Sequence, residues 1–345
     1  MIYDDSKDRY YLSVMRKMEA KRKELYKLHR QESIKRKMLL NRNILNKFRY
    51  TLKNNGTLMA LAYVSTIKNV NMRDTFGRSL LYIACEHDDE VVVRSLISRG
   101  ANINIQSEDG LTPLQRSFAH ANPHISRILL EEGCDPNAYD KYGFRPIHYV
   151  AQYDYTMSDE NMSKIFKILL QKGADVNALS KKGLTALHAT TSAGRIEQME
   201  WLLNAGADPN GGSIEGSETP LMRSIGPYTY RGDEAFELLL EYGASVHAFN
   251  WHGRNVLHLS AEYNVTSYIG TILEKGVDIN GKDKYGYTAL HWAVEKHSVD
   301  VVDMLLGYGA DWDVKNERGK GVLDTKLRCA EDNIIRDMLL KHIGA

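Results

Sequence analysis

Apolar residues recur along this chain at the spacing of short helices that bury one face. In one clear example Ile196, Met199 and Leu202 lie three residues apart, which is the spacing of an apolar stripe on a helix. Gly206 follows this stripe, at a place where a glycine with positive φ commonly ends a helix. A shorter apolar stretch, Leu187–Ser192, precedes the stripe. The pattern therefore predicts pairs of short helices that are separated by turns.

The predicted turns share a polar tetrapeptide that ends in glycine. It begins at Asp74, Ser107, Asp140, Ser180, Ser213, Asn250, Asp283 and Asn316. Five of the seven intervals are 33 residues long, and the other two are 40 and 37. A short polar side chain in the first position bonds to the local backbone, and glycine in the fourth accepts a positive φ. The spacing indicates a structural repeat.

Two further motifs keep a fixed place in the repeat. A tetrapeptide such as Thr185–His188 or Thr288–His291 follows the turn, and its threonine is a good N-cap for the first helix. A second motif, seen clearly at Gly173–Asn177, closes each repeat. These three motifs recur in one order and resemble the ankyrin repeat family. The resemblance implies an all-α solenoid of helix-turn-helix repeats with β-turn or hairpin loops, in which neighbouring repeats bury each other's apolar faces.

The resemblance also predicts how the chain is organised. We expect a basic helical segment at residues 1–49 and a repeat domain at residues 50–345. The domain comprises a degenerate first repeat at about 50–73, seven repeats at 74–315 and a capping repeat at 316–345. Asn54-Asn55-Gly56 marks a break before the helix of the first repeat.

The resemblance implies that a protein partner binds on the turn tips and on the exposed side of the first helices. Aromatic residues and arginine, which often dominate binding energy at interfaces, are frequent there. The predicted contact residues are Phe76, Arg78, Tyr142, Phe144, Tyr153, Trp251, Arg254, Tyr263, Tyr285 and Tyr287. Phe144, Trp251 and Tyr287 carry the most weight, because tyrosine after Asp-Lys is common in this family.

Two repeats are longer than the others. The larger insertions lie in Tyr153–Glu160 and near Gly226–Gly232, and both contain tyrosines and fall between a first and a second helix. Insertions in repeat arrays collect on one face, which is often the binding face. Tolerated loop drift is an equal alternative, because a longer loop costs little conformational entropy.

The sequence lacks the groupings of the common catalytic and metal sites. Histidines recur once per repeat at His148, His188, His258 and His291. Helices in neighbouring repeats pack about 8–10 Å apart, whereas zinc needs ligands at about 2 Å. The resemblance implies instead that each histidine bonds to a neighbouring loop. We therefore expect no metal, no cofactor, no small-molecule substrate and no enzymatic activity.

The N-terminal segment differs from the rest in charge. Residues 1–50 hold 15 Lys/Arg and 6 Asp/Glu, whereas the remainder is net acidic. Residues 7–50 contain no proline or glycine, which predicts a long helix. Its apolar stripe comprises Leu12, Met15, Met18, Leu25 and Leu28. This asymmetry predicts a separate role for the segment.

Four interpretations of this helix stay open. Its stripe could pack on the first repeat as a cap. A bipartite nuclear-import signal could be formed by Lys21, Arg22, Lys35, Arg36 and Lys37. A basic amphipathic helix also suits a membrane surface or a calmodulin-like protein. The fourth interpretation is nucleic acid, which is bound by neutralising phosphates.

The leading functional prediction is a monomeric protein-interaction module, an adaptor, scaffold or inhibitor. The alternatives are a substrate-recognition subunit for ubiquitin ligation, against which the missing C-terminal box argues, and a nuclear regulatory protein that uses the basic helix. We predict an intracellular protein, cytoplasmic or nuclear, because no secretory signal and no membrane-spanning run are visible. The family further implies Asn177 as a candidate substrate for an asparaginyl hydroxylase.

Overall fold

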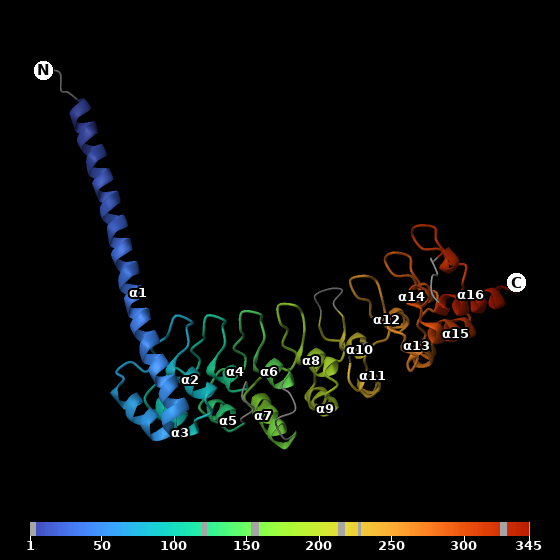
Figure 1. Cartoon of the computed structure of the whole chain (residues 1–345), viewed down its shortest axis with the longest axis horizontal. Helices are drawn as coiled ribbons and strands as arrows, with labels where there is room; N and C mark the ends of the chain where they lie inside the picture. Colours follow the sequence, from blue (N-terminus) through green and yellow to red (C-terminus); the bar gives the residue numbers. More distant parts are fainter. Residues whose placement is uncertain are drawn as a thin grey trace. The chain divides into compact units, whose positions relative to one another are not determined.

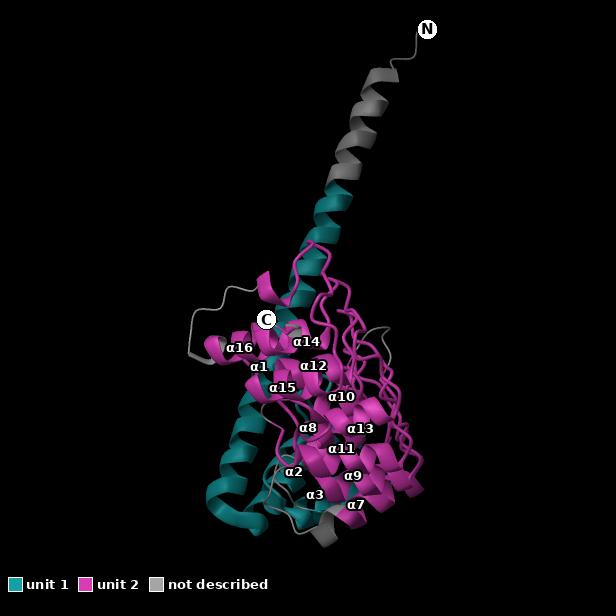
Figure 2. Cartoon of the chain, turned by 90° about the vertical axis from the view of Figure 1, so that its right-hand side faces the viewer, with its two compact units in different colours: residues 1–134 teal, residues 135–345 magenta. Residues whose placement is uncertain are grey.

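The computed structural model describes residues 5–118, 123–152, 159–212, 218–226, 229–324 and 330–344, with side chains omitted at 5–17, 159–162, 330–332 and 343. The described residues form helices and turns, and their only isolated β-bridge joins Arg73 and Ser79. They divide into two compact units, Met1–Cys134 and Asp135–Ala345 (Figure 2). The fold is therefore all-α, as the repeat pattern predicts.

Each unit consists of helix pairs that follow one another along the chain (Figure 1). The first unit contains α1 (Asp5–Thr66), α2 (Leu80–Glu86), α3 (Glu90–Ser98), α4 (Pro113–Ser117) and α5 (Pro123–Glu131). The second begins with α6 (Pro146–Gln152), α7 (Asp159–Gln171), α8 (Ala186–Ser192), α9 (Ile196–Asn204), α10 (Pro220–Ser224) and α11 (Gly232–Glu241). It continues with α12 (Val256–Glu262), α13 (Ile269–Glu274), α14 (Ala289–Glu295), α15 (Val299–Gly307), the 3-10 helix η2 (Val322–Asp324) and α16 (Ala330–Ile343).

The first helices start where the threonine motif predicts. At α14, the Thr288 side chain accepts a hydrogen bond from the His291 backbone N–H, while the Thr288 N–H donates to His291 Nδ1. This reciprocal capping box satisfies two of the four backbone N–H groups that a helix leaves unpaired at its start. The same box occurs at Thr112 and Thr185. The motif thus fixes the beginning of each of these helices.

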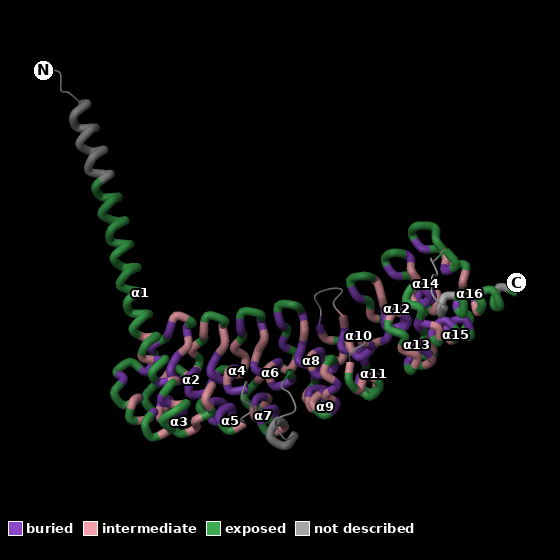
Figure 3. The backbone as a smooth tube through the Cα atoms, viewed as in Figure 1, coloured by how far each residue is buried: buried purple, intermediate pink, exposed green. Residues whose placement is uncertain are grey.

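The core runs between the helices of neighbouring pairs. In the second unit, Leu257 of α12 and Leu290 of α14 are each 1% exposed, and Ile272 of α13 and Leu305 of α15 are fully buried. Figure 3 shows buried backbone along the helices and exposed backbone at the turn tips. Each pair therefore completes its apolar core on the next pair, as expected for a repeat array.

Helix α1 changes direction at Gly56, which has φ 77 and ψ 175. The break coincides with the predicted Asn54-Asn55-Gly56 signal. Leu45 and Phe48, ahead of the break, are buried, with exposed fractions of 1% and 0%. Arg49 pairs with Glu86 of α2 at 2.6 Å. Burial raises the pKa of Glu86, but Arg49 and Arg116 lower it further than burial raises it, so the carboxylate stays ionised.

The interpretation in which the apolar stripe of α1 packs on the first repeat is wrong for its described side chains. Every residue from 18 to 40 is exposed, and Met18, Leu25 and Leu28 are 64%, 50% and 53% accessible. At about 100° per residue, Ile34 and Met38 point to the side opposite Met18, so no single face is apolar. Toward its C-terminal end α1 approaches the first repeat: Ile34 and Met38 border a hollow beside Met72, and the Asn41 amide donates to the Arg73 carbonyl.

The last helix, α16, buries one face only. Ile335 and Leu339 are fully buried, whereas Ile334 and Leu340 are 48% and 39% exposed. This one-sided burial suits the predicted capping repeat, which needs an outer face in water. None of the helices in the described ranges is both long and apolar enough to cross a membrane.

Candidate functional site

The turn tips are built by one side chain and one glycine. Asp283 Oδ1 accepts hydrogen bonds from the backbone N–H groups of Tyr285 and Tyr287, at 2.8 and 2.9 Å. Gly286 has φ 77, and a Cβ atom there would lie 2.5 Å from the backbone nitrogen of Glu317. Only glycine allows this approach, because successive turns are joined by backbone bonds such as Glu317 N–H to the Tyr285 carbonyl at 3.1 Å.

The second oxygen of a turn aspartate is buried and has its own donor. Asp283 Oδ2 accepts from the indole nitrogen of Trp292 at 3.1 Å. Asp140 Oδ2 accepts from the Tyr149 hydroxyl at 2.7 Å. Both donors lie nine residues after their aspartate, on the first helix of the repeat. A buried carboxylate without such a donor would be costly, so these two turns each fix an aromatic side chain.

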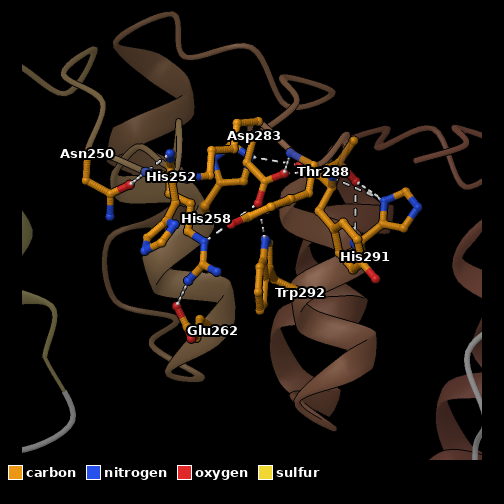
Figure 4. Close-up of polar contacts among 12 residues, drawn as sticks. Asn250, His252, His258, Glu262, Asp283, Thr288, His291 and Trp292 are labelled. Atoms are coloured by element: carbon orange, nitrogen blue, oxygen red, sulfur yellow. Dashed lines mark hydrogen bonds and ion pairs between the residues drawn. The ribbon is translucent and has the colours of Figure 1, made fainter. Parts of the chain in front are cut away.

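Trp292 is further held by charged groups (Figure 4). The Arg254 guanidinium lies 3.7 Å from the centre of the indole ring, which is cation–π geometry. The same guanidinium pairs with Glu262 at 2.7 Å and lies 3.6 Å from Asp283. Lys296 approaches Glu262 at 3.9 Å. The exposed side-chain fraction is only 14% for Arg254 and 15% for Glu262, so solvent screens this network weakly.

A groove of about 470 Å³ lies beside this network. Its walls include the rings of Tyr285, Tyr287 and Trp292. Arg254, Lys284, Glu295, Glu317 and Arg318 complete the lining. A second hollow of about 310 Å³ shares Tyr287 and Glu295 with the groove and extends to Lys320 and Asp324. We call the larger hollow the Trp292 groove.

The Trp292 groove unites three of the predicted contact residues, Arg254, Tyr285 and Tyr287. Tyr285 is 46% exposed, whereas Arg254 and Tyr287 are half-buried. Trp251 is 59% exposed on the preceding turn, and its carbonyl accepts a bond from Lys284 Nζ at 3.2 Å. Tyr263 lies at the C-cap of α12, outside the groove lining, and is 37% exposed.

The remaining predicted residues lie elsewhere. Tyr142 is 57% exposed on its own turn tip, and Phe144 lines a separate hollow of about 340 Å³ with His148 and His188. In the first unit, Phe76 is 52% exposed under the guanidinium of Arg78.

Two predicted features can be located only in part. Tyr153 and most of the first insertion lie outside the described residues. The second insertion follows the C-terminal end of α10, whereas turn tips precede the N-terminal ends of first helices. Tyr230 in it is 65% exposed, and Arg231 bonds to Glu234 at 2.8 Å and to Glu197 of α9 at 3.3 Å. The insertion therefore marks a surface separate from the turn tips.

Trp292 was missed from the sequence as a site residue. It directly follows the histidine of the Thr-Ala-Leu-His motif, and the matching positions in the other repeats hold Ile83, Arg116, Tyr149, Ala189, Arg223 and Leu259. Its distance of nine residues from Asp283 is the signal that could have identified it.

The recurring histidines bond to neighbouring loops, as the resemblance implies. His148 Nε2 faces the Leu184 carbonyl at 3.1 Å, and His188 Nε2 faces the Glu218 carbonyl at 2.9 Å. Their Nδ1 atoms accept from backbone N–H groups at the helix start, so the neutral Nε2–H form fits both sites. Burial lowers the pKa of His188 to about 4.

Asn177 also bridges neighbouring repeats. Its Nδ2 donates to the Gly206 carbonyl at 3.1 Å, and its Oδ1 accepts from the Asp208 N–H at 2.8 Å. Asn137 and Asn210 make the same pair of bonds. Hydroxylation of Asn177 stays a prediction, and an added oxygen at this residue in mass spectra of protein from its native cell would test it.

The five basic residues singled out on α1 all lie in its exposed stretch. Lys21, Arg22, Lys35, Arg36 and Lys37 belong to two Lys-Arg-Lys triplets, at 21–23 and 35–37. Equivalent positions of the two triplets are 14 residues apart, which is about 21 Å along a helix. Every residue from 18 to 40 is exposed, and only the end of this stretch, at Ile34, Lys37 and Met38, borders a hollow with residues of the first unit such as Met72.

Comparison with known proteins decides the family. A family model that describes three consecutive ankyrin repeats matches residues 50–140, 81–178, 147–250 and 228–316. The chain belongs to the ankyrin repeat family. A comparison with curated proteins gave no match. Ankyrin repeats are in general non-catalytic modules for protein–protein interaction, and the turn tips of this ankyrin-repeat protein carry the exposed aromatic residues Phe76, Tyr142, Trp251 and Tyr285.

Proposed function

We propose that this ankyrin-repeat protein is an adaptor, scaffold or inhibitor that binds a partner protein in the Trp292 groove. The observation that carries the proposal is the fixed aromatic wall, in which Arg254, Glu262 and Asp283 hold Trp292 in place. A rigid aromatic surface loses little conformational entropy on binding. The proposed protein works as a monomer without catalysis or cofactor, in the cytoplasm or the nucleus.

Pull-down with cross-linking tests this proposal. The full chain is compared with a Tyr285→Ala/Tyr287→Ala double variant and with a Tyr142→Ala control. Tyr142 and Tyr285 occupy the same place in two identical Asp-Lys-Tyr-Gly turns and are 57% and 46% exposed, so the control removes a comparable tyrosine elsewhere. We expect the double variant to lose its main partner and the control to keep it, with cross-links near residues 284–320. Retention of every partner by the double variant would contradict the proposal.

The exposed stretch of α1 supports a second candidate function, contact with a nuclear-import receptor. All six residues of its two basic triplets are exposed to solvent. A fluorescent fusion in which Lys35, Arg36 and Lys37 are changed to Ala should shift from nucleus to cytoplasm. A Gln31→Ala/Ser33→Ala fusion controls for general effects on this helix. A triple-variant fusion that stays in the nucleus would contradict the import role. A role in ubiquitin ligation stays a hypothesis that no contact favours.

A further inference from the structure

We propose that the Trp292 groove binds an uncharged, proline-rich segment in the polyproline II conformation. This inference rests on the proposed function and deepens it by naming the chemistry of the partner segment. Three lines of observation support it: the aromatic wall, the balance of charges along the groove, and the match in length between repeat and ligand.

The wall offers three rings and little freedom to rearrange. Tyr285, Tyr287 and Trp292 line one groove, and the ring centres of Tyr287 and Trp292 are 5.4 Å apart. Trp292 is fixed from one side by Arg254 and at its nitrogen by Asp283. Aromatic-lined grooves of this kind take proline-rich segments, because prolines pack on ring faces and the segment is already ordered before it binds.

The charges in the groove cancel. Arg254 is paired with Glu262 and also faces Asp283, so it offers no net charge to a ligand. The rest of the lining carries two cations, Lys284 and Arg318, and two carboxylates, Glu295 and Glu317. An acidic or a basic segment would therefore face as many like charges as opposite charges. Electrostatic complementarity favours a segment without charge.

The dimensions favour polyproline II over the other regular conformations. The groove and the neighbouring hollow meet at Tyr287 and Glu295, and their linings come from the three successive repeats that begin at Asn250, Asp283 and Asn316. Helices of adjacent repeats pack about 8–10 Å apart. One turn of polyproline II advances about 9 Å in three residues. Two residues of a strand advance only about 6.7 Å, and one turn of an α-helix about 5.4 Å. Residues n and n+3 of such a segment would thus face successive repeats.

The hydrogen-bond donors of the groove also suit a polyproline II segment. A polyproline II segment has no internal hydrogen bonds, so its carbonyl groups are open to donors. The lining tyrosines, Tyr285 and Tyr287, each carry a hydroxyl that can donate. A Tyr→Phe change separates this contribution from that of the ring.

Fluorescence polarisation with the full chain tests the inference. The probe is a labelled peptide of about 12 residues with the repeat Leu-Pro-Pro, which forms about four polyproline II turns. A Gly-Ser peptide of equal length is the flexible control, and Glu-rich and Lys-rich peptides represent charged partners. We expect saturable binding of the Leu-Pro-Pro peptide, at least about tenfold tighter than binding of the other three. Equal or tighter binding of the Gly-Ser, Glu-rich or Lys-rich peptide would overturn the proposal.

Variants locate the binding. Tyr285→Ala should weaken binding of the Leu-Pro-Pro peptide about tenfold, as expected for loss of one aromatic contact, while Tyr142→Ala leaves it unchanged. Tyr287→Phe should weaken it less than Tyr287→Ala. Thermal melts of each variant, followed by circular dichroism, show whether the fold is retained. Unchanged affinity in Tyr285→Ala and Tyr287→Ala would overturn the assignment to this groove.

The outcome is separable from that of the proposed function. If the cross-linked partner still depends on Tyr285 and Tyr287 but the Leu-Pro-Pro peptide does not bind, the partner class is wrong and the interaction function stands. If the peptide binds but no partner depends on these tyrosines, the groove recognises prolines and the proposed function needs another surface. Failure of both experiments would contradict both the proposed function and the proline-rich partner segment.

Discussion

At the scale of residues, a buried turn carboxylate needs a donor, and the first helix supplies it in two repeats. Asp140 and Asp283 are each followed nine residues later by a donor, Tyr149 or Trp292. Asp74 has Ile83 at that place and is paired instead with Arg78 of its own turn at 2.8 Å. The place of Trp292 in the groove is therefore tied to Asp283.

This dependence predicts the effect of removing the indole donor. Trp292→Phe keeps a ring over Arg254 but leaves Asp283 Oδ2 without its bond at 3.1 Å. Arg254, at 3.6 Å, is then the remaining partner of this oxygen, so we expect the free energy of unfolding to fall by about 1.5–3 kcal/mol, the usual contribution of a hydrogen bond to a charged group. Denaturation in guanidinium chloride measures this change in the free energy of unfolding. Adding Asp283→Asn should recover part of the loss. Stability equal to that of the unchanged protein would contradict the proposed dependence.

The buried histidines predict a pH dependence with a definite sign. His188 is held neutral, with its pKa lowered from the ordinary 6.5 to about 4 by burial. The unfolded chain therefore binds the proton first, and the contribution of His188 to stability is complete above about pH 6.5 and is lost progressively toward pH 4. Denaturation midpoints between pH 7.5 and 5 should fall more steeply for the unchanged protein than for His188→Gln. Parallel curves for the two proteins would refute this assignment.

At the scale of elements, the sequence predicts the helix pairs well because their signals are local. The capping threonines, the turn aspartates and the glycines act within a few residues, and the structure places the helices where these signals occur. The packing of α1 was predicted less well. A stripe from Met18 to Leu28 can be read from spacing, but whether it meets another surface depends on where the helix leaves the unit.

The candidate site was predicted in part for a similar reason. Arg254, Tyr285 and Tyr287 follow from their positions in the motifs. Trp292 depends on a side-chain bond to Asp283 and on an arginine from the preceding repeat. Such contacts between repeats cannot be read from the pattern of one repeat alone. The separate hollow beside Phe144 likewise appears only when neighbouring repeats are packed.

The break in α1 carries a prediction at this scale. Gly56 has φ 77 and ψ 175, a conformation that is almost restricted to glycine, and a Cβ atom there would meet nothing within 4 Å. Gly56→Ala should therefore destabilise the fold through backbone strain alone, by about 1–3 kcal/mol. Gly307→Ala, in helix α15 and equally open, should be neutral or stabilise by up to about 1 kcal/mol. Thermal and chemical melts compare the two, and a stabilised Gly56→Ala protein would show that the break is dispensable.

At the scale of the whole molecule, repeat arrays depend on their ends. An inner repeat is covered on both sides, whereas an end repeat needs a cap that covers apolar surface on one side and faces water on the other. In the first unit, α1 packs against α2 and α3, and its residues Leu45 and Phe48 are buried. Every residue from 18 to 40 is exposed. One helix therefore combines a structural segment with a free basic segment.

Two truncations separate these segments. Removing residues 1–40 should leave the melting temperature within error and keep partner capture, because no buried side chain is lost from the described part of the segment. Removing residues 1–56 also removes the buried side chains of Leu45 and Phe48. Loss of a buried Phe alone typically costs about 3–5 kcal/mol, so the first unit should melt at a lower temperature or aggregate. Differential scanning calorimetry with static light scattering distinguishes these results. A destabilised 41–345 protein would mean that the exposed stretch supports the fold, whereas a stable 57–345 protein would mean that the repeats need no N-terminal cap. The expected result assigns the first 40 residues to recognition alone.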